Sequence, residues 1–186
     1  MTMESDVRKL KKCSFIGHRT VDDSKQVASI LKESITALIE KQGVNTFLFG
    51  SRSEFNDICH QVVTELREQY PALTRIAYTC RSEWACMESE REENERGFSK
   101  IMNKEISLKG YEGEVEFDKK YEAGRASYIE RNQAMINDSD VCIFYYNDTY
   151  KPKGSGKSGT KIAYEYAVKK AQKKKGEFEI INIYKK

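Results

Sequence analysis

The feature that most constrains the fold is an alternation of short apolar runs with longer segments of helical periodicity. Residues 13–16 form an apolar run that ends at a turn, and the apolar residues of 27–39 recur at helical spacing. Thr46–Phe49 is a second apolar run, and the helical segment after it stops before Pro71. Strands that alternate with helices of about 15 residues predict right-handed crossovers and a parallel sheet covered on both faces.

The same alternation continues to the end of the chain. It predicts strands over Leu73–Cys80, Val141–Tyr146 and Phe178–Ile183, and helices over Ser127–Asn137 and Thr160–Lys174. Asp22 or Asp23 is available to cap the first helix, and Gly43 to end it. Charge dominates from Arg81 to Lys120, and we interpret this segment as a partly helical insertion. The expected fold is an open, mainly parallel α/β sheet of about five strands with helices on both faces.

The composition fits a single domain that spans residues 1–186, with 39% hydrophobic and 33% charged residues. No apolar run approaches the roughly 18 residues that span a bilayer, and residues 1–12 contain no apolar stretch for a signal sequence, so we expect a cytoplasmic protein. The five cysteines are an odd number without C-x-x-C spacing, which predicts reduced, partly buried thiols. His18 and His60 are not spaced with the cysteines or with each other as ligand pairs, so we expect no zinc or other metal site. We also expect no resident cofactor.

The net charge of +3 conceals a segregation of charge along the chain. Glu83 to Arg96 holds six acids and two arginines, whereas Lys151 to Lys175 holds nine lysines and a single acid, Glu165. The basic end has the charge that a nucleic-acid ligand needs, but it lacks the interleaved aromatics of a groove that stacks single strands. For Lys169 to Lys175 alone, a solvated helix face is the simpler explanation.

Three predicted loops follow strands, and open parallel sheets bind ligands at the carboxyl ends of their strands. These loops are Gly17-His18-Arg19, Gly50-Ser51-Arg52-Ser53-Glu54 and Gly154 to Thr160. Glycines let a phosphate approach the backbone, a helix N-terminus supplies N–H groups, and Arg19, Arg52 and Lys157 supply charge. Together the loops predict an anion site.

The third loop needs separate treatment, because residues 154–159 satisfy G-x-G-x-x-G. A dinucleotide fingerprint belongs to a first strand-helix turn and needs an acid at the end of the next strand, whereas this loop lies in the last crossover without such an acid. A phosphate-binding P-loop would need glycine at position 151, where the sequence has Lys151. What remains is Ser158-Gly159-Thr160 at the start of a helix, with an ordinary N-cap in a flexible loop as the alternative.

Other polar residues are candidates for ligand contacts or catalysis. Tyr128, Arg131 and Asn132 lie on one predicted helix, although an exposed ion pair would equally explain Arg131 and Glu130. His18 is a candidate acid-base or ligand-contacting residue, or a loop histidine with a structural bond. Glu165 is a candidate functional carboxylate, and the alternative for it is an i,i+4 ion pair with Lys161 or Lys169.

The order of these motifs resembles the SLOG superfamily of Rossmann-like proteins, and within it the YpsA-like group. The matching segments are Phe15 to Arg19, Gly50 to Phe55, Tyr128 to Gln133 and Lys157 to Thr160. The resemblance implies a Rossmann-like domain with a pocket for a nucleotide-derived small molecule, either NAD-like or ADP-ribose-like or a nucleoside phosphate. It also implies pairing into a homodimer or a larger assembly.

The resemblance implies several kinds of relative, namely sensors, lonely-guy phosphoribohydrolases and DprA-type proteins that bind single-stranded DNA. The enzymes carry P-G-G-x-G-T-x-x-E, but the third residue after Thr160 is Ala163, and Glu165 follows two positions later. Two positions rotate a side chain by about 200 degrees on a helix. We therefore favour a sensor or binding protein, with an N-glycosidase or phosphoribohydrolase using Glu165 or Glu130 as the first alternative. Single-strand nucleic-acid binding through Lys151 to Lys175 is the second.

Overall fold

The structure, a computed structural model, describes residues 10–50, 53–80, 110–117, 125–152 and 156–185. The strands in these ranges are β1 (Lys11–Gly17), β2 (Val44–Phe49), β3 (Thr74–Cys80), β4 (Gly113–Phe117), β5 (Val141–Tyr145) and β6 (Glu179–Asn182). The helices are α1 (Ser24–Gln42), α2 (Glu54–Leu66), α5 (Arg125–Asp138) and α6 (Gly159–Lys173). None of the described helices is long and apolar enough to cross a bilayer.

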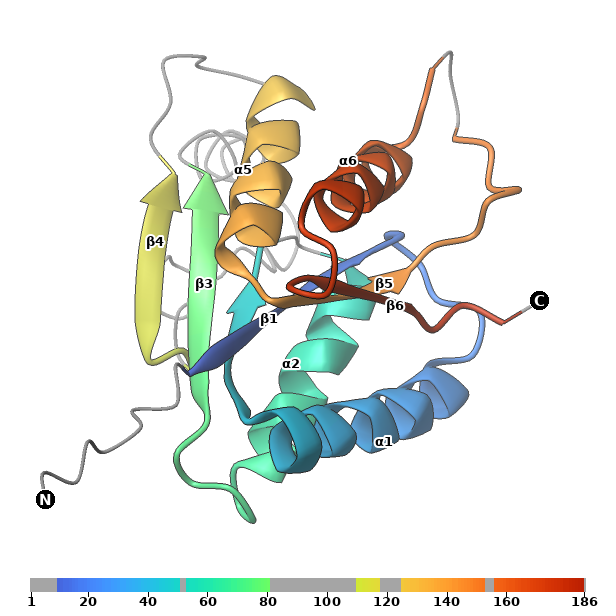
Figure 1. Cartoon of the computed structure of the whole chain (residues 1–186). Coiled ribbons are helices and arrows are strands. Elements are labelled where there is room, and N and C mark those ends of the chain that lie inside the picture. Colours follow the sequence, from blue (N-terminus) through green and yellow to red (C-terminus); the bar gives the residue numbers. More distant parts are fainter. Residues whose placement is uncertain (1–9, 51–52, 81–109, 118–124, 153–155, 186) are drawn as a thin grey trace, which may run out of the picture.

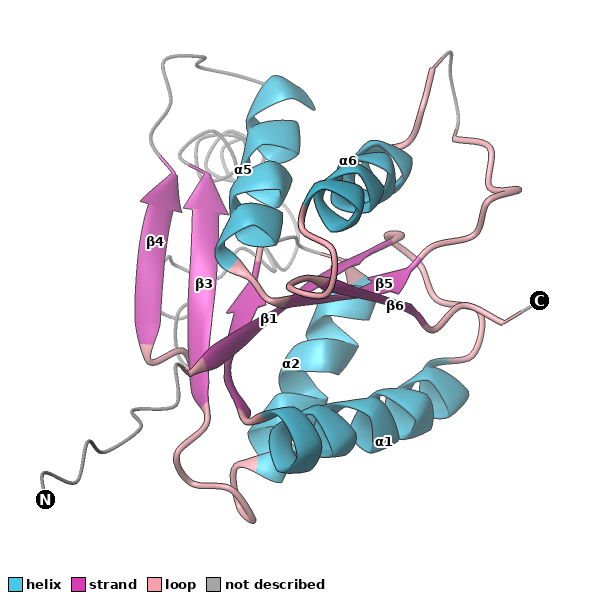
Figure 2. Cartoon of the chain, viewed as in Figure 1, coloured by secondary structure: helices cyan, strands magenta, loops and turns pink. Residues whose placement is uncertain are grey.

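The strands form one sheet in the order β4-β3-β2-β1-β5-β6, and every neighbouring pair is parallel. Helices α1 and α2 cover one face, and α5 and α6 cover the other (Figures 1 and 2). The predicted Rossmann-like α/β architecture is therefore confirmed. The strand count is corrected, because the sheet has six strands instead of about five.

The additional strand, β4, lies inside the segment 81–120 that we interpret as an insertion. Its sequence, Gly113-Glu-Val-Glu-Phe117, has a glutamate at every second position and so lacks the continuous apolar run that marks the central strands. A strand at the edge of a sheet pairs on one side only, here with β3, and tolerates such charge. Residues 81–109 and 118–120 lie outside the described residues, so the insertion and its helical content stay predictions.

Helix α1 begins and ends at the predicted residues. The Asp23 carboxylate accepts the N–H of Gln26 at 3.0 Å, which caps the first turn. Gly43 follows the helix with a φ of +71° and donates its N–H to the Ile39 carbonyl at 3.2 Å. Glycine adopts this left-handed conformation without the steric cost of a side chain, which is why it ends the helix.

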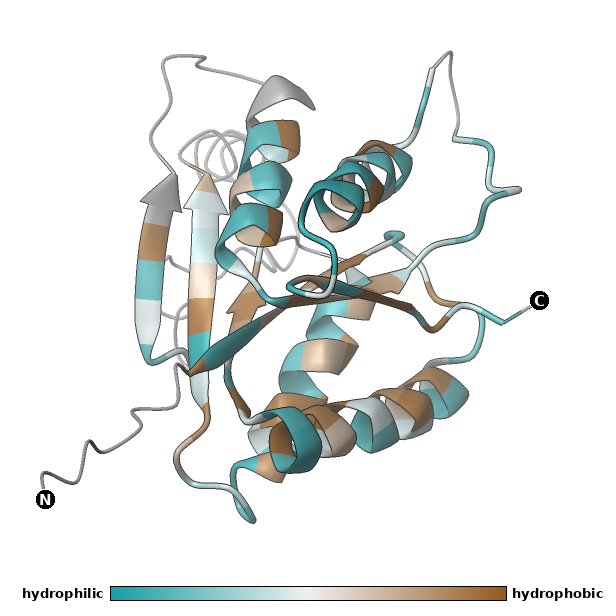
Figure 3. Cartoon of the chain, in the orientation of Figure 1, coloured by the Kyte–Doolittle hydropathy of each residue, from teal (hydrophilic) through white to brown (hydrophobic). Residues whose placement is uncertain are grey.

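The central strands are mainly apolar after their first residues, where both of their faces are buried (Figure 3). On the face of α1 and α2, the Phe15 ring packs against Phe47 and Phe49, with ring centroids 5.9 and 5.1 Å away. On the opposite face, Ile16 and Phe144 pack in the cluster that includes residues of α6.

Four of the five predicted reduced thiols are free and buried, at positions Cys13, Cys59, Cys80 and Cys142. Cys86 lies outside the described residues.

The strand order reverses its direction between β1 and β5. From β1 the chain proceeds outward through β2 and β3 to β4, and it then returns to the other side of β1 for β5 and β6. The loop after β1 leads to α1 on one face, and the loop after β5 leads to α6 on the other (Figure 1). In open α/β sheets this switch point, at the carboxyl ends of the strands, is where ligands bind.

Candidate functional site at the carboxyl ends of the central strands

The first and third predicted loops meet at the ends of β1 and β5. Gly17 and Tyr145, the last residues of these strands, lie opposite one another in the sheet. The His18 N–H donates to the Tyr145 carbonyl at 3.2 Å. The Thr160 hydroxyl donates to the Gly17 carbonyl at 3.0 Å, so the start of α6 is fixed against the end of β1.

The N-terminus of α6 is open. Ser158 is its N-cap, and its hydroxyl accepts the N–H of Lys161 at 3.1 Å. The N–H groups of Gly159 and Thr160 precede the first helical hydrogen bond, and neither donates to another described residue. A Cβ placed on Gly159 would meet no atom within 4 Å. Within the described part of the chain, two amides at the positive end of the helix dipole are therefore left without a hydrogen-bond acceptor.

The N-terminus of α2, by contrast, is bonded to the loop after β1. The Glu54 N–H donates to the Arg19 carbonyl at 2.9 Å, and the Glu54 carboxylate accepts the N–H of Val21 at 2.9 Å. The Ser53 hydroxyl caps the helix by accepting the Asn56 N–H. The sequence places Glu54 in the second predicted anion loop, although an acid directly after a serine cap is also a usual first-turn residue. Ser51 and Arg52, which precede this helix, lie outside the described residues.

The glycines at the ends of β1 and β2 are required by packing. A Cβ on Gly17 would overlap the Phe55 ring of α2. A Cβ on Gly50 would overlap the sulfur of Met135 and lie 3.0 Å from Nε of Arg131. The close approach at both glycines is thus made by side chains of the protein, whereas a Cβ on Gly159, at the start of α6, would meet no described atom within 4 Å.

Helix α5 brings one of its predicted residues to the end of β2. The Arg131 side chain is 2% exposed, lies beside Gly50, and stacks its guanidinium over the ring of Tyr128 with 5.4 Å between Cζ and the centroid. Glu130 and Asn132, its neighbours on the helix, are half-buried. Arg131 therefore adds positive charge to the edge where the loops meet.

His18 is held as a neutral ring. Its Nε2 lies 3.0 Å from the backbone nitrogen of Asn147, and because an amide can only donate, Nε2 accepts and the ring proton is on Nδ1. The side chain is 6% exposed, and this burial lowers its pKa. Its ring centroid lies 4.4 Å from that of Tyr150, in the loop after β5. The hydrogen bond from Asn147 to His18 connects the loop after β1 to the loop that leads to α6.

Glu165 forms an ion pair with Lys157. The ammonium group lies 2.9 and 2.7 Å from the two carboxylate oxygens, and the two side chains are 55% and 43% exposed. The hydrogen bond from Lys157 lowers the pKa of the Glu165 carboxyl group. The bonding partner is thus eight residues earlier in the chain and is neither Lys161 nor Lys169. Glu165 is held as an anion, which does not suit it to act as a general acid.

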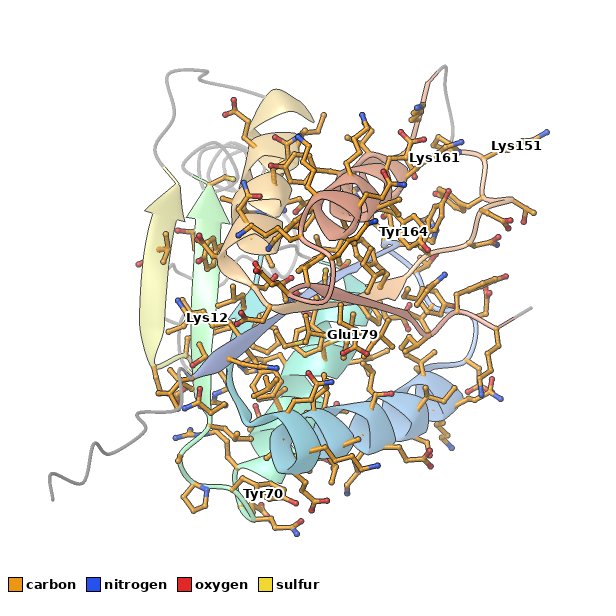
Figure 4. All side chains as sticks on the ribbon, viewed as in Figure 1. Lys12, Tyr70, Lys151, Lys161, Tyr164 and Glu179 are labelled. Carbon is orange, nitrogen blue, oxygen red and sulfur yellow. The ribbon has the colours of Figure 1, made fainter. Side chains whose placement is uncertain are left out.

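The basic segment divides into two kinds of lysine. Lys151, in the loop after β5, and Lys161, on α6, are labelled in Figure 4 on the same end of the molecule as the start of α6. Lys170 instead donates to the carbonyl groups at the end of α5, including Ser139 at 2.7 Å. One lysine of the predicted solvated face therefore caps a neighbouring helix, and the charge near the α6 N-terminus comes from the earlier part of the segment.

Comparison with known proteins shows the family of the chain and its similarity to solved structures. The model of the YspA SLOG family matches residues 18–186. DNA processing protein A from Helicobacter pylori, whose structure was solved to describe how that protein binds single-stranded DNA, has 16% identity and a TM-score of 0.43. The match covers 91% of this chain and 74% of that one. A comparison with curated proteins gives no match.

Proposed function

The chain belongs to the YspA SLOG family, and from this premise we propose that it binds a phosphate-bearing, nucleotide-derived small molecule as a sensor or ligand-binding protein. The proposed ligand is NAD-like or ADP-ribose-like, or a nucleoside phosphate. Its phosphate would lie at the switch point between β1 and β5, against the start of α6.

The observation that carries this proposal is the open N-terminus of α6. Anions bind at helix N-termini because unpaired N–H groups and the helix dipole both favour negative charge. The amides of Gly159 and Thr160 provide these donors, and the absence of a side chain on Gly159 lets a phosphate approach them. The Gly17 carbonyl holds Thr160 in place, so the donors are positioned before a ligand arrives.

Nearby positive charge supports the same proposal. Lys157 directly precedes the cap and is exposed, and Arg19 is exposed on the loop after β1. Arg131 lies farther along the edge, at the end of β2. A ligand with two phosphate groups, or with a phosphate and a sugar, would extend from the start of α6 along this edge.

Calorimetric titration with ADP-ribose, NAD and AMP tests the proposal. We expect saturable binding of at least one of them to the wild-type chain. Lys157→Gln and Arg19→Gln remove exposed charges at the site, and each should weaken binding by about tenfold. Lys41→Gln is the matched control, because Lys41 is an exposed lysine in the last turn of α1, adjacent to the start of β2 at the opposite edge of the sheet. Its affinity should equal that of the wild type.

The same experiment separates the proposal from its two alternatives. Absence of binding to all three ligands would contradict it. Release of free base, detected by chromatography and abolished by Glu165→Gln or Glu130→Gln, would instead support an N-glycosidase or phosphoribohydrolase. Binding of an oligonucleotide that falls steeply with salt and that ADP-ribose does not compete would support the nucleic-acid alternative.

A further inference from the structure

The exposed aromatic ring of Tyr150 packs on His18, the residue that follows Gly17 at the end of β1. Tyr150 is 46% exposed, and it is one of three large hydrophobic side chains that are exposed in the described part of the chain. One side of its ring packs on His18, with 4.4 Å between centroids and an interplanar angle of 37°. A single exposed tyrosine is ordinary, so its meaning depends on how it is held.

Hydrogen bonds of one residue, Asn147, fix the turn that carries Tyr150. The Asn147 side-chain oxygen accepts both the N–H and the hydroxyl of Thr149, at 2.9 and 2.7 Å. Its carbonyl accepts the N–H of Tyr150 at 3.2 Å, and its own N–H donates to Nε2 of His18 at 3.0 Å. The ring is thus held in place without a ligand, and such preorganisation lowers the entropy cost of binding.

Further aromatic rings connect Tyr150 to the start of α6. The His18 ring lies 6.0 Å from Tyr146, and Tyr146 stacks on Tyr164 with 4.5 Å between centroids. Tyr164 follows Thr160 by one helical turn and lies on the side of α6 that faces the sheet (Figure 4). Tyr146 and Tyr164 are half-buried against each other, which leaves Tyr150 as the most exposed ring of this aromatic row.

We infer that the base of the bound nucleotide stacks on Tyr150, so that the site accepts base-bearing nucleotides and discriminates against sugar phosphates. This inference rests on the proposed function, since the phosphate at the start of α6 brings the base to the ring. Stacking requires only a flat π surface, which every base has. The site therefore accepts adenine and guanine with similar affinity, and the larger purine rings bind more tightly than pyrimidines.

The test compares ADP, GDP and ribose 5-phosphate as calorimetric ligands of the wild type, Tyr150→Ala and Tyr150→Phe. In the wild type, ADP and GDP should bind within a few-fold of each other, and ribose 5-phosphate about tenfold or more weaker. Tyr150→Ala should reduce ADP affinity by about tenfold or more and leave ribose 5-phosphate unchanged. Tyr150→Phe keeps the ring and should keep the affinity. Urea denaturation of each variant confirms that it is folded.

The possible failures are distinguishable. If ADP and ribose 5-phosphate bind the wild type equally and Tyr150→Ala changes neither, the inference is overturned and the proposed phosphate site stands. If Tyr150→Ala weakens both ligands by the same factor, the ring supports the site in general and the stacking role is wrong. If the wild type binds ADP-ribose, NAD or AMP but neither ADP nor ribose 5-phosphate, the inference is overturned and the proposed function stands. If it binds none of these ligands, the proposed function fails and the inference fails with it.

Discussion

Helices α2 and α6 both begin at the carboxyl edge of the sheet, and both are capped by a serine, yet their first turns are used differently. In α2, the Glu54 N–H donates to the Arg19 carbonyl, and the Glu54 carboxylate accepts the N–H of Val21 from the same loop. In α6, the N–H groups of Gly159 and Thr160 have no such protein partner among the described residues. One helix start stabilises the fold, and the other is available to a ligand.

If the proposed site is correct, a helix N-terminus at the carboxyl edge of the sheet is by itself insufficient for binding an anion. The first-turn amides must also remain free, and the adjacent residue must leave room. At α2 the first-turn residues are Glu54 and Phe55, and the Phe55 ring lies against Gly17. At α6 the corresponding residues are Gly159 and Thr160, with open space around the glycine.

The largest expected effect is on stability at the α2 side of this comparison. Gly17→Ala places a methyl group against the Phe55 ring, which must shift within a packed core. We expect the free energy of unfolding to fall by about 1–3 kcal/mol. Urea denaturation measures it. A change below about 0.5 kcal/mol would show that the packing of α2 on β1 is loose.

Gly159→Ala tests the α6 side. The added methyl group meets no protein atom within 4 Å, so the urea midpoint should stay close to that of the wild type. The methyl group would occupy space that the phosphate needs, and we expect ADP-ribose affinity to fall by about tenfold. Calorimetry of the two proteins side by side measures this. Unchanged affinity would remove Gly159 from the site.

Glu54→Ala removes the acceptor of the Val21 N–H and a first-turn acid of α2. We expect a loss of about 1 kcal/mol in the free energy of unfolding. The matched variant is Glu165→Ala on α6, which breaks an exposed ion pair and should not change stability measurably. If the two variants destabilised the protein equally, the distinction between the bonded and the open helix start would be wrong.

The smallest expected effect is a pH dependence through His18. Burial lowers its folded-state pKa below the ordinary value of about 6.5, so between the two values the unfolded chain binds more protons. Its contribution to stability is complete above about pH 6.5 and is lost as pH falls through the folded pKa. Burial also lowers the pKa of His60, so its contribution to stability is likewise lost as the pH falls.

As the pH is lowered from about 7.5 to about 5.5, the urea midpoint of the wild type should fall. The midpoint of His18→Asn should fall less, because only His60 then contributes to the pH dependence. The comparison with His60→Asn separates the two rings. An equal slope in the wild type and His18→Asn would show that the bond from Asn147 to His18 does not depend on the charge of the ring.

The sequence predicts the parts of the fold that follow from local pattern. Apolar runs locate the buried strands, and Asp23 and Gly43 mark the ends of α1 because capping is a local interaction. The edge strand β4 is missed, because alternating charge at an exposed edge resembles a loop. The meeting of the Gly17 loop with Ser158-Gly159-Thr160 was predictable, since parallel strands place their carboxyl ends at one edge.

The roles of individual residues at that edge could not be predicted in the same way. The bonds from Glu54 to Val21 and from Asn147 to His18 depend on loop conformations that have no periodic signal. The neighbours of Gly17 and Gly50 depend on how helices dock on the sheet. The sequence offers one signal for Tyr150, which is an aromatic residue in the polar loop directly after the predicted strand Val141–Tyr146.

The central claim is that the ligand binds at the open start of α6. Titration of 15N-labelled protein with ADP-ribose, followed by amide NMR spectra, tests it most directly. If the ligand binds there, the largest shifts occur at the amides of Gly159 and Thr160, with much smaller shifts at Glu54 and Asn56 in the first turn of α2. Largest shifts in α2 or in the segment between β3 and β4, or no shifts at saturating ligand, would contradict it.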